Sequence, residues 1–185
     1  MKHAESSAAT KAVLVKSFCQ LYEQLPLEKV TVKEISEKAG VSRVTFYNYF
    51  SDPYQLVEEL EDEIIETFIA NARLTITSSL NSDLFTTIFI DTFEKNKPLV
   101  KLLFTGSHAG VFVAKAKESI IALISPLIKD YGANSFESYA IEYHISGMVG
   151  IFQRWFIVED VETSQMAPII KNILLNSPVA SIIQA

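Results

Sequence analysis

The chain has 185 residues, of which 49% are hydrophobic, and a formal net charge of −6 at pH 7. It can hold one sizeable core and a small appended one, and its longest apolar stretches fall short of the roughly 20 residues that span a bilayer. Its one cysteine excludes an intrachain disulfide, and its amino-terminal residues lack the apolar region of a secretory signal. We therefore expect a cytoplasmic protein without a membrane segment.

Apolar residues recur with helical spacing in the first part of the chain, and Pro26 ends this predicted helix. The residues on this spacing are Ala12, Val15, Phe18, Cys19, Leu21 and Tyr22. Because Cys19 shares the spacing with two aromatic residues, we expect a packed core thiol and not a redox sensor.

Residues 31–50 predict a helix, a glycine-led turn and a second short helix. Thr31 is a good N-cap, and Glu34 three residues later completes a capping box for the first helix. Gly40 can adopt the positive φ that a sharp turn needs, and Ser42 can cap the second helix. The two helices should therefore cross at a steep angle.

The second helix, predicted over 43–50, would turn Phe46 and Phe50 inward and leave an outer face for DNA. Its arginine suits guanine, its asparagine suits adenine or phosphate, its valine suits a thymine methyl, and its hydroxyls suit phosphate oxygens. The candidate DNA-binding residues are Thr31, Lys33, Ser42, Arg43, Val44, Thr45, Tyr47, Asn48 and Tyr49.

The run from Thr31 to Phe50 resembles the DNA-binding domain of the TetR family, in its Gly-Val-Ser turn, its Thr-Phe-Tyr triplet and its closing phenylalanine. The resemblance covers about the first third of the chain. It implies an all-α fold with a three-helix helix-turn-helix head over 1–52, in which residues 10–25 form the first helix. A connecting helix would join this head to a carboxy-terminal helical body over 53–185 that binds ligand and dimerises.

The resemblance also implies a function. It indicates a sequence-specific transcriptional regulator, by default a repressor, that binds a palindromic operator on double-stranded DNA as a homodimer. Residues 1–50 carry seven Lys or Arg and five Glu. The remaining residues carry nine Lys or Arg and seventeen Asp or Glu. DNA would therefore meet a localised basic patch on an acidic protein.

Two positions depart from the family pattern. Pro53 stands where members usually carry a lysine that meets a phosphate, although proline suits a first helical position after a cap by Asp52 or Ser51. Tyr49 stands where histidine is common, and its hydroxyl can still reach a phosphate. The proline at position 53 removes one electrostatic contact with a phosphate, whereas the tyrosine at position 49 can keep its phosphate contact.

Beyond residue 52 the apolar spacing predicts further helices, and no alternating strand pattern competes with it. The connecting helix begins at Pro53, runs to about Leu80, and carries an acidic face that we interpret as solvated. Later helices are predicted over 83–94, 99–104, 111–129, 136–158 and 165–176, with a break at 95–98 and a glycine-containing loop at 105–110.

The predicted helix 136–158 is apolar on more than one side, so one face should pack inward and another needs a partner. The inner face would hold Ile141, Ile145, Met148, Phe152 and Phe156. The outer face would hold Tyr139, Tyr143, Gly147, Gly150 and Arg154, with glycines that permit close approach of a second helix. The resemblance implies a two-fold dimer built from the last two long helices.

Members of the TetR family commonly bind a small molecule in the body and then release DNA, so the resemblance implies a small-molecule effector here as well. The candidate pocket residues are Phe89, Phe93, Phe104, His108, Phe112, His144, Phe152 and Trp155. Each aromatic residue taken singly is more often a core residue than a pocket residue.

Residues for catalysis are scarce. His3, His108 and His144 show no metal-ligand spacing, and the sequence has neither a phosphate-binding glycine loop nor a nucleophile paired with a base. We therefore expect no enzyme activity, no cofactor and no metal. The alternative function is a TetR-like co-regulator that has lost operator binding and docks a protein partner, which Pro53 and the modest charge of the head keep open.

Overall fold

The computed structural model describes residues 2–77, 82–128, 131–158 and 161–176, and every regular element in these ranges is a helix. The helices are α1 (Lys2–Tyr22), α2 (Val32–Ala39), α3 (Arg43–Tyr47), α4 (Pro53–Thr77), α5 (Ser82–Thr105), α6 (Ala109–Ile124), α7 (Phe136–Val158) and α8 (Thr163–Leu175), with short 3-10 turns at Leu27–Lys29 and Ser125–Leu127. The predicted all-α fold is confirmed. None of the helices in the described ranges is long and apolar enough to cross a membrane.

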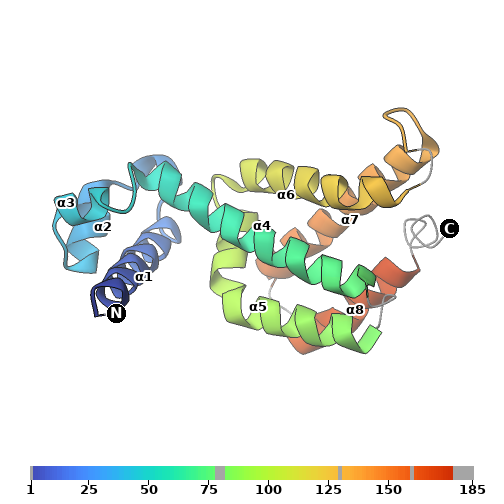
Figure 1. Cartoon of the computed structure of the whole chain (residues 1–185), viewed down its shortest axis with the longest axis horizontal. Coiled ribbons are helices and arrows are strands. Elements are labelled where there is room, and N and C mark those ends of the chain that lie inside the picture. Colours follow the sequence, from blue (N-terminus) through green and yellow to red (C-terminus); the bar gives the residue numbers. More distant parts are fainter. Residues whose placement is uncertain (1, 78–81, 129–130, 159–160, 177–185) are drawn as a thin grey trace.

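The head formed by α1, α2 and α3 lies at one end of an elongated molecule, and α4 leads from it into the body (Figure 1). In the body, α4 packs against α5 and α6, while α5 also contacts α7 and α8. The connecting helix α4 therefore links the head to the centre of the body.

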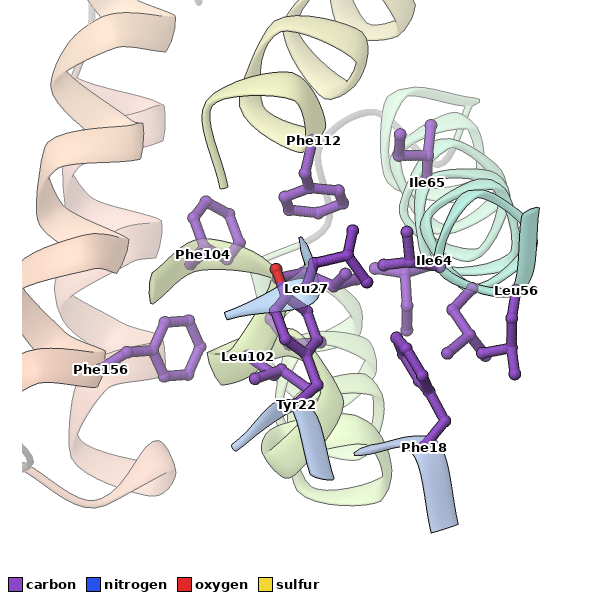
Figure 2. Packing of buried hydrophobic residues seen from close by; sticks show 14 of the residues in the cluster. Phe18, Tyr22, Leu27, Leu56, Ile64, Ile65, Leu102, Phe104, Phe112 and Phe156 are labelled. Carbon is purple, nitrogen blue, oxygen red and sulfur yellow. The ribbon is translucent and has the colours of Figure 1, made fainter. Parts of the chain in front are cut away.

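One hydrophobic core extends from the head into the body. Phe18 and Tyr22 at the end of α1 lie among side chains of α4 and α5, including Ile64 and Leu102 (Figure 2). The same cluster continues to Trp155 and beyond on the last two helices. A smaller cluster forms where the end of α6 meets α7, around Ile124, Ile128, Ile141 and Ile145.

Helix α5 runs through Pro98 without a break, so the predicted interruption at 95–98 is wrong. A proline inside a helix removes one hydrogen bond and costs roughly 3 kcal/mol. Phe93 and Val100, on either side of it, are buried in the core. Packing of these apolar residues holds the helix across the proline, which a local reading of the sequence could not show.

Two helices end earlier than predicted. Helix α6 stops at Ile124 and not at 129, because the backbone tightens into the 3-10 turn that contains Pro126. Helix α3 stops at Tyr47 and not at 50, because the N–H groups of Tyr49 and Phe50 both donate to the carbonyl of Phe46, at 2.9 and 3.0 Å. This tight turn places the Phe50 side chain in the core.

Other boundaries also moved. Helix α1 begins at Lys2 and not at 10, in a stretch rich in alanine, which favours helix. Helix α8 begins at Thr163, two residues early, where Glu162 and Gln165 form a capping box. The predicted end of α4 near Leu80 lies outside the described residues.

The loop between α5 and α6 approaches α1 so closely that Gly106 has no room for a side chain. A Cβ atom there would lie 2.6 Å from the Tyr22 hydroxyl oxygen and 2.6 Å from the Leu102 carbonyl oxygen. Gly110, at the start of α6, has no atom within 4 Å of the corresponding position. The loop can therefore reach the head only with glycine at 106.

Cys19 on α1 packs against the main core, as predicted. Burial, with a smaller contribution from the nearby Glu23 carboxylate, raises the pKa of the Cys19 thiol to about 11. The protonated thiol is a weak nucleophile, so the environment does not favour redox sensing.

We expect Gly106→Ala to lower the free energy of unfolding by about 1–3 kcal/mol, because the new methyl group must displace the Tyr22 ring or the helix end. Gly110→Ala is the matched control and should be neutral or slightly stabilising. Urea unfolding followed by circular dichroism measures both, and equal effects in the two variants would contradict the close approach at 106.

Cys19 should react slowly with an alkylating reagent at pH 8. A thiol with a pKa of about 11 holds about a hundredth of the thiolate of a thiol at 9.0, so alkylation should be about a hundredfold slower in the folded chain than in urea. Mass spectrometry of timed samples gives both rates. Equal rates would restore the redox-sensing interpretation.

Candidate nucleic-acid interface

Helix α2 begins at the predicted capping box. The Thr31 hydroxyl oxygen accepts from the Glu34 N–H at 3.3 Å, and the Glu34 carboxylate accepts from the Thr31 hydroxyl at 2.6 Å and from its N–H at 3.0 Å. These hydrogen bonds, the hydroxyl foremost, lower the pKa of Glu34. Since the Thr31 hydroxyl both accepts and donates within the cap, its first role is to fix the start of α2.

The turn after α2 depends on Gly40, whose φ of +68° lies in the left-handed region. Its N–H donates to the Glu37 carbonyl at 3.2 Å, and the Val41 N–H donates to the Ser36 carbonyl at 3.0 Å. These bonds satisfy carbonyls at the end of α2 and turn the chain towards α3.

Helix α3 is capped by Ser42, whose hydroxyl oxygen accepts from the Thr45 N–H at 3.0 Å. Beneath the helix, Phe46 and Phe50 are buried with their ring centroids 5.6 Å apart, as the spacing predicted. The cap sets where the helix starts and the two rings set which side faces inward.

The outer face of α3 carries large apolar side chains in solvent. Val44 is 71% exposed and Tyr47 is 57% exposed, and Arg43 and Asn48 are exposed with them. Thr45 is half-buried, and its hydroxyl lies 2.9 Å from that of Ser42. The outer face of α3 therefore offers both apolar and hydrogen-bonding groups to solvent.

Two other predicted contact residues flank this face. Lys33 on α2 is exposed, with its Nζ 3.9 Å from a Glu37 carboxylate oxygen, a loose surface pair that leaves the ammonium accessible. Tyr49 is half-buried, and its hydroxyl oxygen lies 3.1 Å from that of Ser7 on α1. Tyr49 therefore joins the end of the reading segment to the first helix.

Pro53 is the first residue of α4, and Asp52 is its cap, since the Asp52 carboxylate accepts from the Gln55 N–H at 2.8 Å. Lys11 of α1 is engaged nearby: its Nζ lies 2.7 Å from the Glu59 carboxylate and 5.4 Å from the centre of the Phe50 ring. The helix thus starts as predicted without a cation at position 53.

The acidic face of α4 is not wholly solvated, so that interpretation is wrong at Glu61, which is fully buried. Its side chain lies at i+4 spacing between Val57 and Ile65, which are also buried. That spacing was the signal in the sequence that could have identified it.

The predicted pocket aromatics lie together and contact one another. The ring centroids of Phe93 and Phe152 are 5.2 Å apart, and those of Phe104 and Phe112 are 5.1 Å apart. Trp155 lies 5.4 Å from Phe93 and donates from Nε1 to the Val161 carbonyl. The side chain of Phe89 lies outside the described residues.

The two predicted pocket histidines do not pair with each other. His108 precedes α6, and its Nδ1 lies 3.0 Å from a Glu61 carboxylate oxygen. His144 lies on α7, where its Nε2 is buried without a hydrogen-bond partner among the described residues. Burial lowers the pKa of His144.

The proposed outer face of α7 is open to solvent. Tyr139 is 65% exposed and Tyr143 is 79% exposed, and Gly147, Gly150 and Arg154 are exposed as well. On the opposite side of the helix, Ile141, Ile145 and Phe156 are buried, while Met148 and Phe152 are partly buried against the core. Within the described residues, one face of the helix packs in the core and the other face is covered by no element.

Comparisons with known proteins place the head in a family. Residues 19–60 match the model of the bacterial regulatory proteins of the tetR family. This match covers the end of α1, the helix-turn-helix and the start of α4. The comparison with curated proteins found no match.

Several solved structures share the fold along almost the whole chain. The fatty acid degradation regulator FadR from Bacillus halodurans has a TM-score of 0.66 at 11% identity, with 90% of this chain and 95% of that chain covered. The dihydroxyacetone kinase operon activator DhaS has a TM-score of 0.58 at 17% identity, with 94% and 96% covered. The TetR family repressor AlkX from Dietzia sp. strain DQ12-45-1b, implicated in biodegradation of n-alkanes, has a TM-score of 0.53 at 16% identity. The match covers 94% of this chain and 97% of that chain.

At these identities the structural likeness shows the fold, and the match over residues 19–60 supplies the family of the head. Proteins of this family are regulators of transcription and not enzymes. Residues 19–60 are therefore a DNA-binding domain of the tetR family of bacterial regulatory proteins, in a chain whose overall fold is similar to that of the TetR family repressor AlkX.

Proposed function

We propose that the protein is a cytoplasmic repressor that binds a palindromic operator as a homodimer and is released by a small molecule. The observation that carries the DNA-binding part is the outer face of α3, where Val44 and Tyr47 stand in solvent beside Arg43 and Asn48. A helix with such a face fits the major groove, and these residue types read base edges and hold phosphates.

Each side chain has a role set by its place on the helix. Arg43 is the first residue of α3, and the first residues of a recognition helix contact base edges in this motif. Its guanidinium would bind guanine, and Val44 would contact a thymine methyl. Lys33, Tyr47 and Tyr49 would hold phosphates on either side of the groove.

The outer face of α7 supports the homodimer. This face carries two exposed tyrosines, Tyr139 and Tyr143, and two glycines, Gly147 and Gly150, that allow close approach. It can pack against the same face of a second copy in an isologous contact. Phe136 and Ile157, each 71% exposed, extend this face at both ends of the helix. A two-fold dimer would present its two heads to successive turns of DNA.

Release requires an effector that prefers a body conformation in which the heads are wrongly spaced. A groove of about 420 Å³ between α4 and α6 supports such a site on the connecting helix. The residues that line it are Ile65, Glu66, Ile69, Ala70, Arg73, Ser119 and Ala122. This lining suits a mainly apolar molecule.

Selection of the purified protein from a random pool of duplex DNA tests the proposal. Enrichment of a palindrome with half-sites about one helical turn apart would support a dimeric operator-binding regulator. No enrichment by a folded, dimeric protein would favour docking of a protein partner, the alternative that Pro53 keeps open.

Arg43→Ala should weaken binding at one base position by about 1–3 kcal/mol, because a bidentate contact to guanine is lost there. Tyr47→Phe should weaken all operator sequences alike, because a phosphate contact carries no sequence information. Affinities for single-base variants of the selected operator, at one fixed salt concentration, distinguish the two. A uniform loss for Arg43→Ala would contradict its base-reading role.

Tyr143→Asp should convert the dimer to a monomer and lower operator affinity by about tenfold or more, because the two-fold axis places both substituted residues in one interface. Val111→Asp, at an exposed apolar residue of α6, is the matched control and should leave both properties unchanged. Light scattering gives the mass. A dimeric Tyr143→Asp variant would exclude this face as the interface.

A further inference from the structure

The head touches the loop between α5 and α6 through two polar contacts. The Tyr22 hydroxyl oxygen accepts from the backbone N–H of His108 at 2.9 Å, and the Ser107 hydroxyl oxygen accepts from the Leu27 N–H at 2.9 Å. Tyr22 and Leu27 themselves lie among core residues of the body such as Phe104 and Phe112 (Figure 2). The end of α1 and the turn that follows it are therefore fixed to a short loop of the body, through the hydroxyl of the buried Tyr22 and the hydroxyl of the exposed Ser107.

The ring of His108 makes a different contact, to the connecting helix. Its Nδ1 lies 3.0 Å from one carboxylate oxygen of Glu61. With Nδ1 as the donor, the Glu61 carboxylate oxygen accepts this hydrogen bond, since an ionised carboxylate only accepts. One residue of the loop thus binds α1 with its backbone and α4 with its side chain.

The contact with His108 matters because the Glu61 carboxylate is buried. Its side chain is only 1% exposed, and its second carboxylate oxygen has no hydrogen-bond partner in the described part of the chain. Lys115 of α6 stands 4.0 Å from that oxygen, while it pairs at 2.7 Å with the exposed Asp62. A buried carboxylate is tolerated only while it is paired. Rotation or sliding of α4 against α6 would separate Glu61 from its partners and leave an unpaired buried charge, which is unfavourable.

We propose that Tyr22, His108 and Glu61 form a positioning lock that sets the angle of the reading head on the body. In the dimer, this angle fixes the distance between the two copies of α3 and hence the operator spacing that both heads can engage. The spacing consequence rests on the proposed dimeric operator binding, whereas the lock itself concerns a single chain.

The lock differs from a purely structural cluster in what it controls. A structural cluster, when weakened, lowers stability and reduces binding to all operators in the same proportion. Loss of the lock leaves the caps and aromatic residues of the head in place, so each head still reads its half-site. The angle between head and body then varies, and discrimination between spacings falls.

Four variants separate these possibilities. Tyr22→Phe removes only the hydroxyl and keeps the ring in the core. His108→Ala removes the donor to Glu61, whereas His108→Asn keeps an N–H donor near the position of Nδ1 and should restore the contact. Lys117→Ala is the control, because it breaks an ion pair with Glu142 that joins α6 to α7 within the body.

The first experiment measures the angle without DNA. Spin labels on Lys38→Cys of α2 and Glu118→Cys of α6, both exposed positions, report the distance from head to body in full chains diluted with unlabelled protein. Cys19, half-buried and weakly nucleophilic, reacts slowly. The wild type, Lys117→Ala and His108→Asn should give one narrow distribution, and Tyr22→Phe and His108→Ala a broader or shifted one. Unchanged distributions in the last two would overturn the lock.

The second experiment measures operator spacing. On the selected operator, the ratio of affinities between the best half-site spacing and spacings changed by one base pair should fall several-fold in Tyr22→Phe and His108→Ala. Equal loss at every spacing would overturn the consequence for DNA. If the wild type selects no operator, the proposed function fails, and the distance distributions alone still decide whether the lock exists.

Discussion

The insertion of Phe18 and Tyr22 between α4 and α5 is the contact on which the arrangement of the molecule depends. These two rings belong to the three-helix head but pack in the core of the body, so the head and the body share one core (Figure 2). Because protein cores are closely packed, two rings shared in this way limit the head to a narrow set of orientations on the body. The polar contacts of Tyr22 with the loop at 106–108 then choose among closely similar packings.

Within the head, short-range signals determine the structure, and these could be predicted. The capping box at Thr31, the left-handed Gly40 and the cap at Ser42 each act over three or four residues, so their sequence pattern specifies their geometry. The inward turn of Phe46 and Phe50 follows from the same local spacing. The reading face was therefore accessible from the sequence, although its contacts with DNA remain predictions.

The features that escaped prediction depend on residues distant in the chain. Pro98 would end an isolated helix, yet the core around Phe93 and Val100 keeps α5 whole. Glu61 resembles its acidic neighbours, and the approach of His108, 47 residues later, and of Lys115 accounts for a buried carboxylate there. Local spacing could place such residues on a face but could not show which partner that face would meet.

The separation of charge along the molecule has a consequence for how it approaches DNA. The head lies at one end, with a small excess of basic residues, and the acidic remainder of the chain extends away from it (Figure 1). In the field of a duplex such a molecule experiences a torque as well as a weak net repulsion. The torque turns the head towards the phosphates during the encounter, and added salt weakens it. We therefore expect the acidic body to disfavour side-on contacts between the protein and DNA.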